Sequence, residues 1–195
     1  MHYKLVTPAE GIAVSLDEAK QHLRIAHAEQ DAEITSLINA ATLRFEKDTG
    51  MVLLNSEWCL LFDVMPNFSA QHNSHIQIWK APISDITKVE YYTPGTEALQ
   101  TLAADKYIKD NEGIPARVYV SEVPDIDSDR FNAVRVTFTA GYADSTKVPD
   151  LIKSALKLLI AHYYENPSHV VTGTIATLLP DGYNEIANSF KTKLV

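Results

Sequence analysis

The first fifty residues carry hydrophobic positions at helical spacing. The run SLDE at residues 15–18 has the form of a capping box, in which the Ser15 hydroxyl and the Glu18 carboxylate each accept a hydrogen bond from the other residue's amide. It predicts a short helix that ends near residue 25. A second helix is predicted from Asp31 to just before Gly50, because one of its faces gathers apolar side chains: Ile34, Leu37, Ile38, Ala41 and Phe45. The short polar link between the two helices predicts an αα-hairpin.

Between residues 55 and 140 the hydrophobic period changes from 3.6 to 2. Alternating apolar and polar positions occur at residues 57–64, 75–79, 88–92, 117–121 and 134–140. Pro82, the pair Pro94-Gly95 and the pair Pro124-Asp125 are among the turn signals that separate these runs. The pattern predicts five or six short, mostly antiparallel strands, whereas residues 1–14 are expected to form an extended lead-in.

Helical periodicity returns after Pro149. Residues 150–165 have only a narrow polar stripe, so this third helix requires partners on more than one side. The two amino-terminal helices can cover one side, and the β region or another subunit the remainder. A loop at residues 167–180 precedes a short final helix that begins at Pro180-Asp181.

The order of these elements predicts an α+β fold. Residues 1–54 and 141–195 are expected to form one discontinuous helical subdomain, with residues 55–140 as an inserted, mostly antiparallel β-module.

Composition and charge narrow the classes of function. The chain has 195 residues, 46% of them hydrophobic, and its 17 Lys and Arg against 25 Asp and Glu give a formal net charge of −8. This acidity argues against broad phosphate binding, and the single Cys59 excludes an internal disulfide framework. No apolar run is long enough for a signal peptide or a membrane span, so we expect an intracellular protein with no membrane partner.

No motif predicts catalysis, a cofactor or a metal. The acidic run at residues 125–129 starts like an EF-hand loop, but Arg130 and Val136 stand where Gly and a bidentate carboxylate are required. His162 and Glu165 lie three residues apart without a third ligand in a zinc motif. There is no nucleophile elbow or phosphate-binding loop, and Cys59 is interpreted as a small apolar filler on a strand.

Four stretches, taken in order, resemble a known family. They are LVTP and VSLDEAKQHLR at residues 5–8 and 14–24; DAEI, LINAA and TG within residues 31–50; VRVTFTAGY and VP within residues 134–149; and HYYEN, GTIA and LP within residues 162–180. The chain is similar to the head–tail connector proteins of long-tailed bacteriophages, also called head-completion or adaptor proteins, in the branch that carries a β-insertion. Residues 66–132 match only in pattern.

The resemblance implies a structural role in virion assembly. Family members form a ring of about twelve subunits beneath the portal protein, pass DNA through the lumen without sequence-specific binding, and receive the next connector or the tail. The implied location is the head–tail junction of the virion, after assembly in the host bacterial cytoplasm. The family offers no catalytic residues to carry over.

Two other hypotheses of function stay open at this point: another oligomeric adaptor or tail-completion protein, and a metal-binding hydrolase. If the chain assembles, apolar attraction must overcome the repulsion between acidic copies. The end of the third helix and the segment after it are the predicted assembly interface, through Tyr163, Tyr164, Val170, Val171, Ile175 and Leu178.

Overall fold

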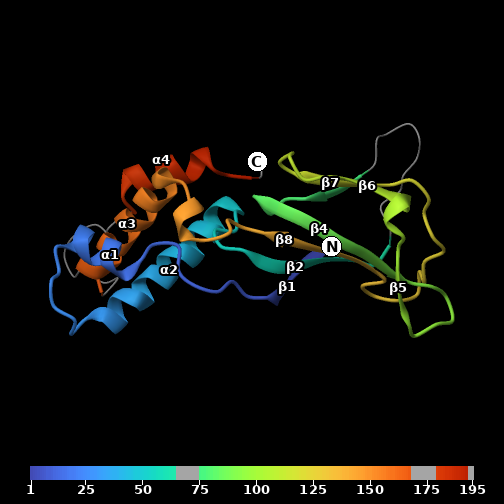
Figure 1. Cartoon of the computed structure of the whole chain (residues 1–195), viewed down its shortest axis with the longest axis horizontal. Helices are drawn as coiled ribbons and strands as arrows, with labels where there is room; N and C mark the ends of the chain where they lie inside the picture. Colours follow the sequence, from blue (N-terminus) through green and yellow to red (C-terminus); the bar gives the residue numbers. More distant parts are fainter. Residues whose placement is uncertain (65–74, 168–178, 193–195) are drawn as a thin grey trace, which may run out of the picture. The chain divides into compact units, whose positions relative to one another are not determined.

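The chain divides into two compact units in the computed structural model, which describes residues 1–64, 75–167 and 179–192 (Figure 1). Unit 1 comprises residues 1–10 and 55–141, and unit 2 comprises residues 11–54 and 142–195. Unit 1 is built from strands and unit 2 from helices, so the fold is α+β as predicted.

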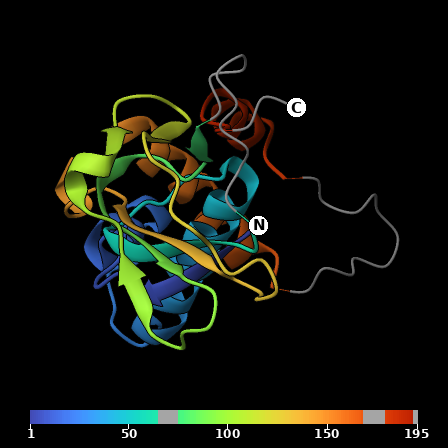
Figure 2. The same cartoon turned by 90° about the vertical axis from the view of Figure 1, so that its right-hand side faces the viewer.

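Unit 1 contains two antiparallel sheets. The larger one has the order β1-β2-β8-β4-β5 and the smaller one β3-β7-β6. Their strands are β1 (His2–Thr7), β2 (Ser56–Phe62), β3 (Ile76–Ile78), β4 (Ile83–Tyr92), β5 (Leu99–Thr101), β6 (Tyr107–Asp110), β7 (Ala116–Val120) and β8 (Val134–Ala140). Figure 2 shows the same chain turned by 90° about the vertical axis.

The two sheets pack their apolar faces together, as alternating patterns require. On β8 the buried side chains include Val136 and Phe138, and on β7 they include Val118, whose neighbours Arg117 and Tyr119 are exposed. The edge-on contact between the rings of Tyr3 and Phe138, with centroids 6.2 Å apart, ties β1 into this core.

The amino-terminal residues correct one expected boundary. Residues 1–10 were assigned to the helical subdomain as part of residues 1–54, but β1 pairs with β2 from His2–Leu61 to Thr7–Glu57 and lies in unit 1. The strands β5 and β6 were also missed, so residues 55–140 hold more strands than the five or six expected. β1 has exposed residues on both faces and therefore lacks the alternation that marks a half-buried strand.

Unit 2 is a group of four helices around one apolar cluster. They are α1 (Leu16–Leu23), α2 (Asp31–Thr49), α3 (Asp150–Glu165) and α4 (Asp181–Ser189), in agreement with the predicted helices to within two residues. The third helix packs against the other three, so α4 of the same unit supplies the extra partner that its apolar surface requires. Gly50 ends α2 in the left-handed region with φ of 77°, as expected for a C-terminal glycine.

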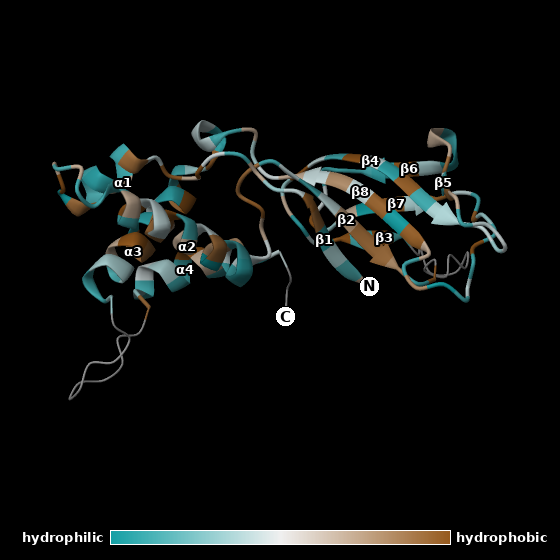
Figure 3. Cartoon of the chain, turned by 90° about the horizontal axis from the view of Figure 1, so that it is seen from below, coloured by the Kyte–Doolittle hydropathy of each residue, from teal (hydrophilic) through white to brown (hydrophobic). Residues whose placement is uncertain are grey.

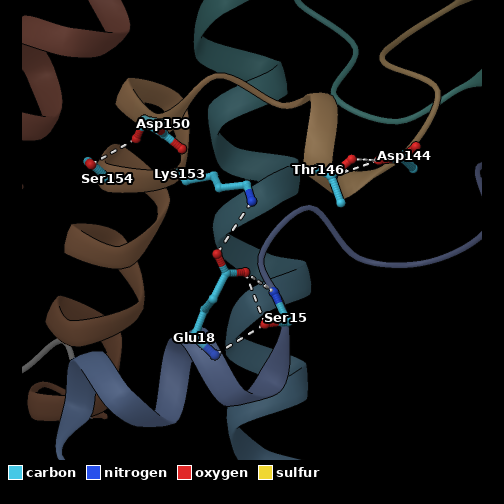
Figure 4. Close-up of polar contacts among 7 residues, drawn as sticks. All are labelled: Ser15, Glu18, Asp144, Thr146, Asp150, Lys153 and Ser154. Atoms are coloured by element: carbon cyan, nitrogen blue, oxygen red, sulfur yellow. Dashed lines mark hydrogen bonds and ion pairs between the residues drawn. The ribbon is translucent and has the colours of Figure 1, made fainter.

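A polar network joins α1 to α3 at their amino-terminal ends (Figure 4). The predicted capping box is present: the backbone amide of Glu18 donates to Ser15 Oγ at 3.2 Å, and the amide of Ser15 donates to Glu18 Oε2 at 2.9 Å. The other carboxylate oxygen of Glu18 lies 3.4 Å from Lys153 Nζ on α3. Thus a local capping residue also makes a long-range ion pair.

Candidate assembly surfaces

A groove of about 600 Å³ runs along one side of unit 2, where α2 lies beside the end of α3. Its lining combines apolar and charged side chains: Glu33, Leu37, Ala40 and Arg44 from α2, and His162, Tyr163, Asn166, Pro167 and Leu179 from the other wall. The apolar members Leu37, Tyr163 and Leu179 are continuous with the buried cluster of the unit. This groove therefore combines apolar surface with a carboxylate, that of Glu33, and a guanidinium, that of Arg44, as protein–protein contacts do.

The guanidinium of Arg44 in the groove is held in place by the carboxylate of Asp48. Arg44 Nε lies 2.7 Å from Asp48 Oδ2, and this carboxylate raises the pKa of the guanidinium. Tyr183, which is fully buried, donates its hydroxyl to the same Oδ2 at 2.8 Å. Burial raises the pKa of the Tyr183 phenol and that of the Tyr163 phenol, although nearby Arg44 opposes the shift of Tyr163. Both phenols are therefore neutral near pH 7.

The predicted interface residues divide into three groups. Tyr163 is half-buried and lines the groove. Tyr164 is also half-buried, but its hydroxyl donates to Gln30 Oε1 at 2.9 Å, beside the start of α2. Val170, Val171, Ile175 and Leu178 lie outside the described residues. The involvement of these six residues in assembly stays a prediction.

A second hollow of about 540 Å³ lies on the face of the five-stranded sheet that points away from the three-stranded one. All five strands of the sheet contribute to its lining, which includes side chains of both charges: Lys4, Glu57, Lys88, Glu90 and Arg135. Lys88 Nζ pairs with Glu90 Oε1 at 2.9 Å, and a guanidinium nitrogen of Arg135 donates to the Tyr92 hydroxyl at 3.2 Å. The sequence analysis missed this hollow because its walls come from distant strands, although Lys88/Glu90 and Arg135/Thr137 are visible as alternating polar positions.

The described residues offer little for bond-making chemistry. Burial raises the pKa of the Cys59 thiol, so it is protonated at neutral pH and a poor nucleophile. Within residues 1–64, 75–167 and 179–192, no group of three His, Cys, Asp or Glu side chains is arranged to hold a metal ion. No helix in the same ranges is long and apolar enough to cross a membrane.

The family model for "phage gp6-like head-tail connector protein" matches residues 13–127, which is more than half of the chain. The chain belongs to this family. The resemblance drawn from the sequence is thereby confirmed, and the role of this connector is structural. No curated protein matches the connector by sequence.

Solved structures share the connector's fold over its whole length. One is a chain from the neck of an empty GTA (gene transfer agent) particle computed with C6 symmetry; it is 22% identical, with a TM-score of 0.81. A second, the virion of a native gene transfer agent particle, is 23% identical with a TM-score of 0.77. A third, the neck of a native particle computed with C12 symmetry, is 22% identical with a TM-score of 0.73. Each match covers 100% of this chain and 97% of the other.

Proposed function

We propose that this connector forms a closed ring of identical copies in the neck of a virion, between the portal protein and the next connector or tail protein. Its work there is structural, without catalysis or a resident cofactor. The observation that carries the proposal is the full-length likeness to chains from two particle necks. One neck was computed with sixfold symmetry and the other with twelvefold symmetry. Membership of the head–tail connector family supports the same structural role for this chain.

The charge of the chain supports a conduit for DNA. A lumen that lets DNA slide should make few cationic contacts with phosphates, because each such contact adds salt-dependent affinity. The formal net charge of −8 per copy is consistent with passage without sequence-specific binding.

Assembly contacts in unit 2 are proposed at the groove between α2 and the end of α3. Tyr163 supplies an aromatic side chain and Arg44 a positioned cation, two residue types that are frequent among residues with large contributions to binding. The segment that follows Tyr164, with Val170, Val171, Ile175 and Leu178, completes this proposed contact.

Deletion of the gene tests the proposal in the strain that produces the particles. We expect DNA-filled heads and free tails to accumulate separately in electron micrographs, and the wild-type gene supplied in trans to restore joined particles. Joined, infectious particles in the deletion strain would contradict a connector role.

A further inference from the structure

The sandwich of unit 1 has strand edges on two opposite sides. The backbone amide of Trp79, just after β3, donates to the Tyr3 hydroxyl of β1 at 2.8 Å, so β3 lies near β1. On the other side, Lys109 Nζ of β6 donates to the backbone carbonyl of Ile86 on β4 at 3.0 Å. Figure 3 accordingly shows β1 and β3 along one margin of unit 1, and β5 and β6 along the other.

The first of these edges is β1. Its pairing with β2 is regular from His2 to Leu5, and the register shifts only between Leu5 and Thr7. Among the described residues, no strand pairs with the other edge of β1. Leu5 is 43% exposed and Val6 50%, and the strand carries one cation, Lys4, and no carboxylate. An exposed edge with apolar side chains is a template for pairing with another chain.

The second edge is β6, which has the same length as the regular part of β1. Its residues Tyr107–Asp110 pair with β7 on one side, and no described strand pairs with the other. Ile108, in the middle of the strand, is 67% exposed. Carboxylates outnumber cations here. Lys106, Lys109 and Arg117 pair with Glu122, Asp85 and Asp110, and two further carboxylates, Asp105 and Glu112, stand at the two ends of β6. The acidic edge thus complements the basic β1.

We propose that β1 of one copy pairs with β6 of the neighbouring copy and so joins adjacent subunits of the ring. The inference rests on the proposed ring and names a contact within it. A closed ring requires a head-to-tail contact between two different surfaces of the same chain, and the two edges lie on opposite sides of unit 1. Added main-chain hydrogen bonds would supply affinity, and cross-strand side chains would fix the register.

The side chains favour an antiparallel arrangement. Without a register shift, it places Lys4 opposite Ile108, His2 opposite Asp110 and Leu5 opposite Tyr107. A parallel arrangement would place Lys4 opposite Lys109 and Leu5 opposite Asp110 instead. Like charges directly opposite each other are destabilising, so the antiparallel pairing is the one we assign.

Disulfide crosslinking in assembled particles tests the pairing. In a Cys59→Ser background, which leaves only introduced thiols, Lys4→Cys is combined with Ile108→Cys. The matched control combines Lys4→Cys with Tyr119→Cys, because Tyr119 is directly opposite Ile108 on β7 and lies one strand further from the free edge. After mild oxidation, we expect the first pair alone to give a ladder of covalent oligomers on a non-reducing gel.

Three outcomes separate this inference from the proposed function. A ring in the neck by electron microscopy, with the ladder from the Lys4/Ile108 pair alone, supports both. A ring with no ladder, or with equal ladders from both pairs, overturns the β1–β6 contact and leaves the ring standing. Particles of the Cys59→Ser parent that are joined but contain no ring of this chain overturn the proposed function itself.

A charge exchange gives an independent readout. Ile108 is exposed, so Ile108→Lys and Ile108→Glu should both leave the monomer folded. We expect Ile108→Lys to lower the yield of joined particles at least tenfold relative to Ile108→Glu, and Lys4→Glu to restore it in the Ile108→Lys background. Equal yields from the two Ile108 variants would overturn the assigned pairing.

Discussion

At the residue scale, Glu18 uses both of its carboxylate oxygens: Oε2 accepts a hydrogen bond from the Ser15 amide, and Oε1 pairs with Lys153. The backbone amide of Ser15 is the main cause that lowers its pKa, with Lys153 contributing in the same direction. The pKa of Glu18 is lower in the folded chain than in the unfolded chain, where it is about 4.3. The ionised carboxylate therefore stabilises the folded state at pH values above that unfolded-state pKa. This contribution is lost as the pH falls through the lower pKa of the folded protein.

Glu18→Gln isolates this charge, because glutamine also serves at this position of a capping box. The side chain is partly exposed, so we expect the variant to lose only about 0.5–1 kcal/mol of unfolding free energy at pH 7. The difference from wild type should shrink toward zero near pH 2.5. Urea unfolding at both pH values measures it, and a difference that is unchanged in acid would contradict the role of the charge.

Tyr183 is the buried aromatic residue that anchors α4. Its hydroxyl donates to Asp48 on α2, and burial raises its pKa, with the bond to Asp48 acting in the same direction. Tyr183→Phe keeps the ring against Phe45 but leaves a carboxylate oxygen without its phenol donor. We expect it to lower the unfolding free energy by about 1.5–3 kcal/mol, as for other hydrogen bonds to charged groups.

Tyr164→Phe is the matched control, because its hydroxyl donates to a neutral amide, that of Gln30. We expect a loss of about 0.5–1.5 kcal/mol for this neutral bond. Equal losses from the two Tyr→Phe variants in urea unfolding would contradict the importance of the Asp48 carboxylate.

Whether a side-chain contact could be predicted from the sequence depended on how far apart its two residues are along the chain. The capping box was predicted because Ser15 and Glu18 are three residues apart, and local spacing alone determines the geometry. The bond between Tyr183 and Asp48 spans 135 residues, and no periodicity in either segment indicates it. The ion pair between Lys153 and Glu18 also spans 135 residues, and the narrow polar stripe of residues 150–165 did not indicate it.

At the element scale, α3 is the helix on which unit 2 depends most. Leu156 is fully buried in the apolar cluster of unit 2, whereas Leu151 on the same helix is 51% exposed. Leu156→Ala should cost about 2–5 kcal/mol of unfolding free energy, because it removes packed methyl groups and leaves a cavity.

Leu151→Ala is the control and should change stability by no more than about 0.5 kcal/mol. Both variants replace leucine with a residue of high helix propensity, so the comparison reports packing rather than helix formation. Similar losses from the two variants would contradict the assigned packing of α3.

The helices were predictable as elements and several strands were not. α1 begins at a capping box, α3 and α4 each begin directly after a proline, and all four helices of unit 2 have an apolar face at the helical period. The strands β1, β5 and β6 are short and largely exposed, so alternation is absent. β1 exists because β2 supplies its hydrogen bonds from at least fifty residues away. The hollow on the sheet face depends on strand pairings of this kind, and the groove depends on the packing of α2 beside the end of α3. Local sequence patterns indicate neither.

At the scale of the whole assembly, like charges oppose ring formation. Twelve copies at −8 each would carry a formal charge of roughly −96. Salt shortens the range of this repulsion, with a Debye length of about 10 Å at 0.1 M. We expect the assembled fraction, measured by sedimentation velocity, to rise between about 0.02 and 0.2 M salt. Assembly that weakens steadily over this range would indicate that attraction between charges holds the ring together.

The central claim is a closed ring of this chain in the virion neck, and a reconstruction of the neck tests it most directly. Particles from the strain that encodes the connector would be imaged by cryo-electron microscopy and the neck reconstructed without imposed symmetry. We predict one closed ring between head and tail into which units 1 and 2 fit as repeated copies. Density for a single copy, or a complete neck with no ring of this fold, would contradict the account.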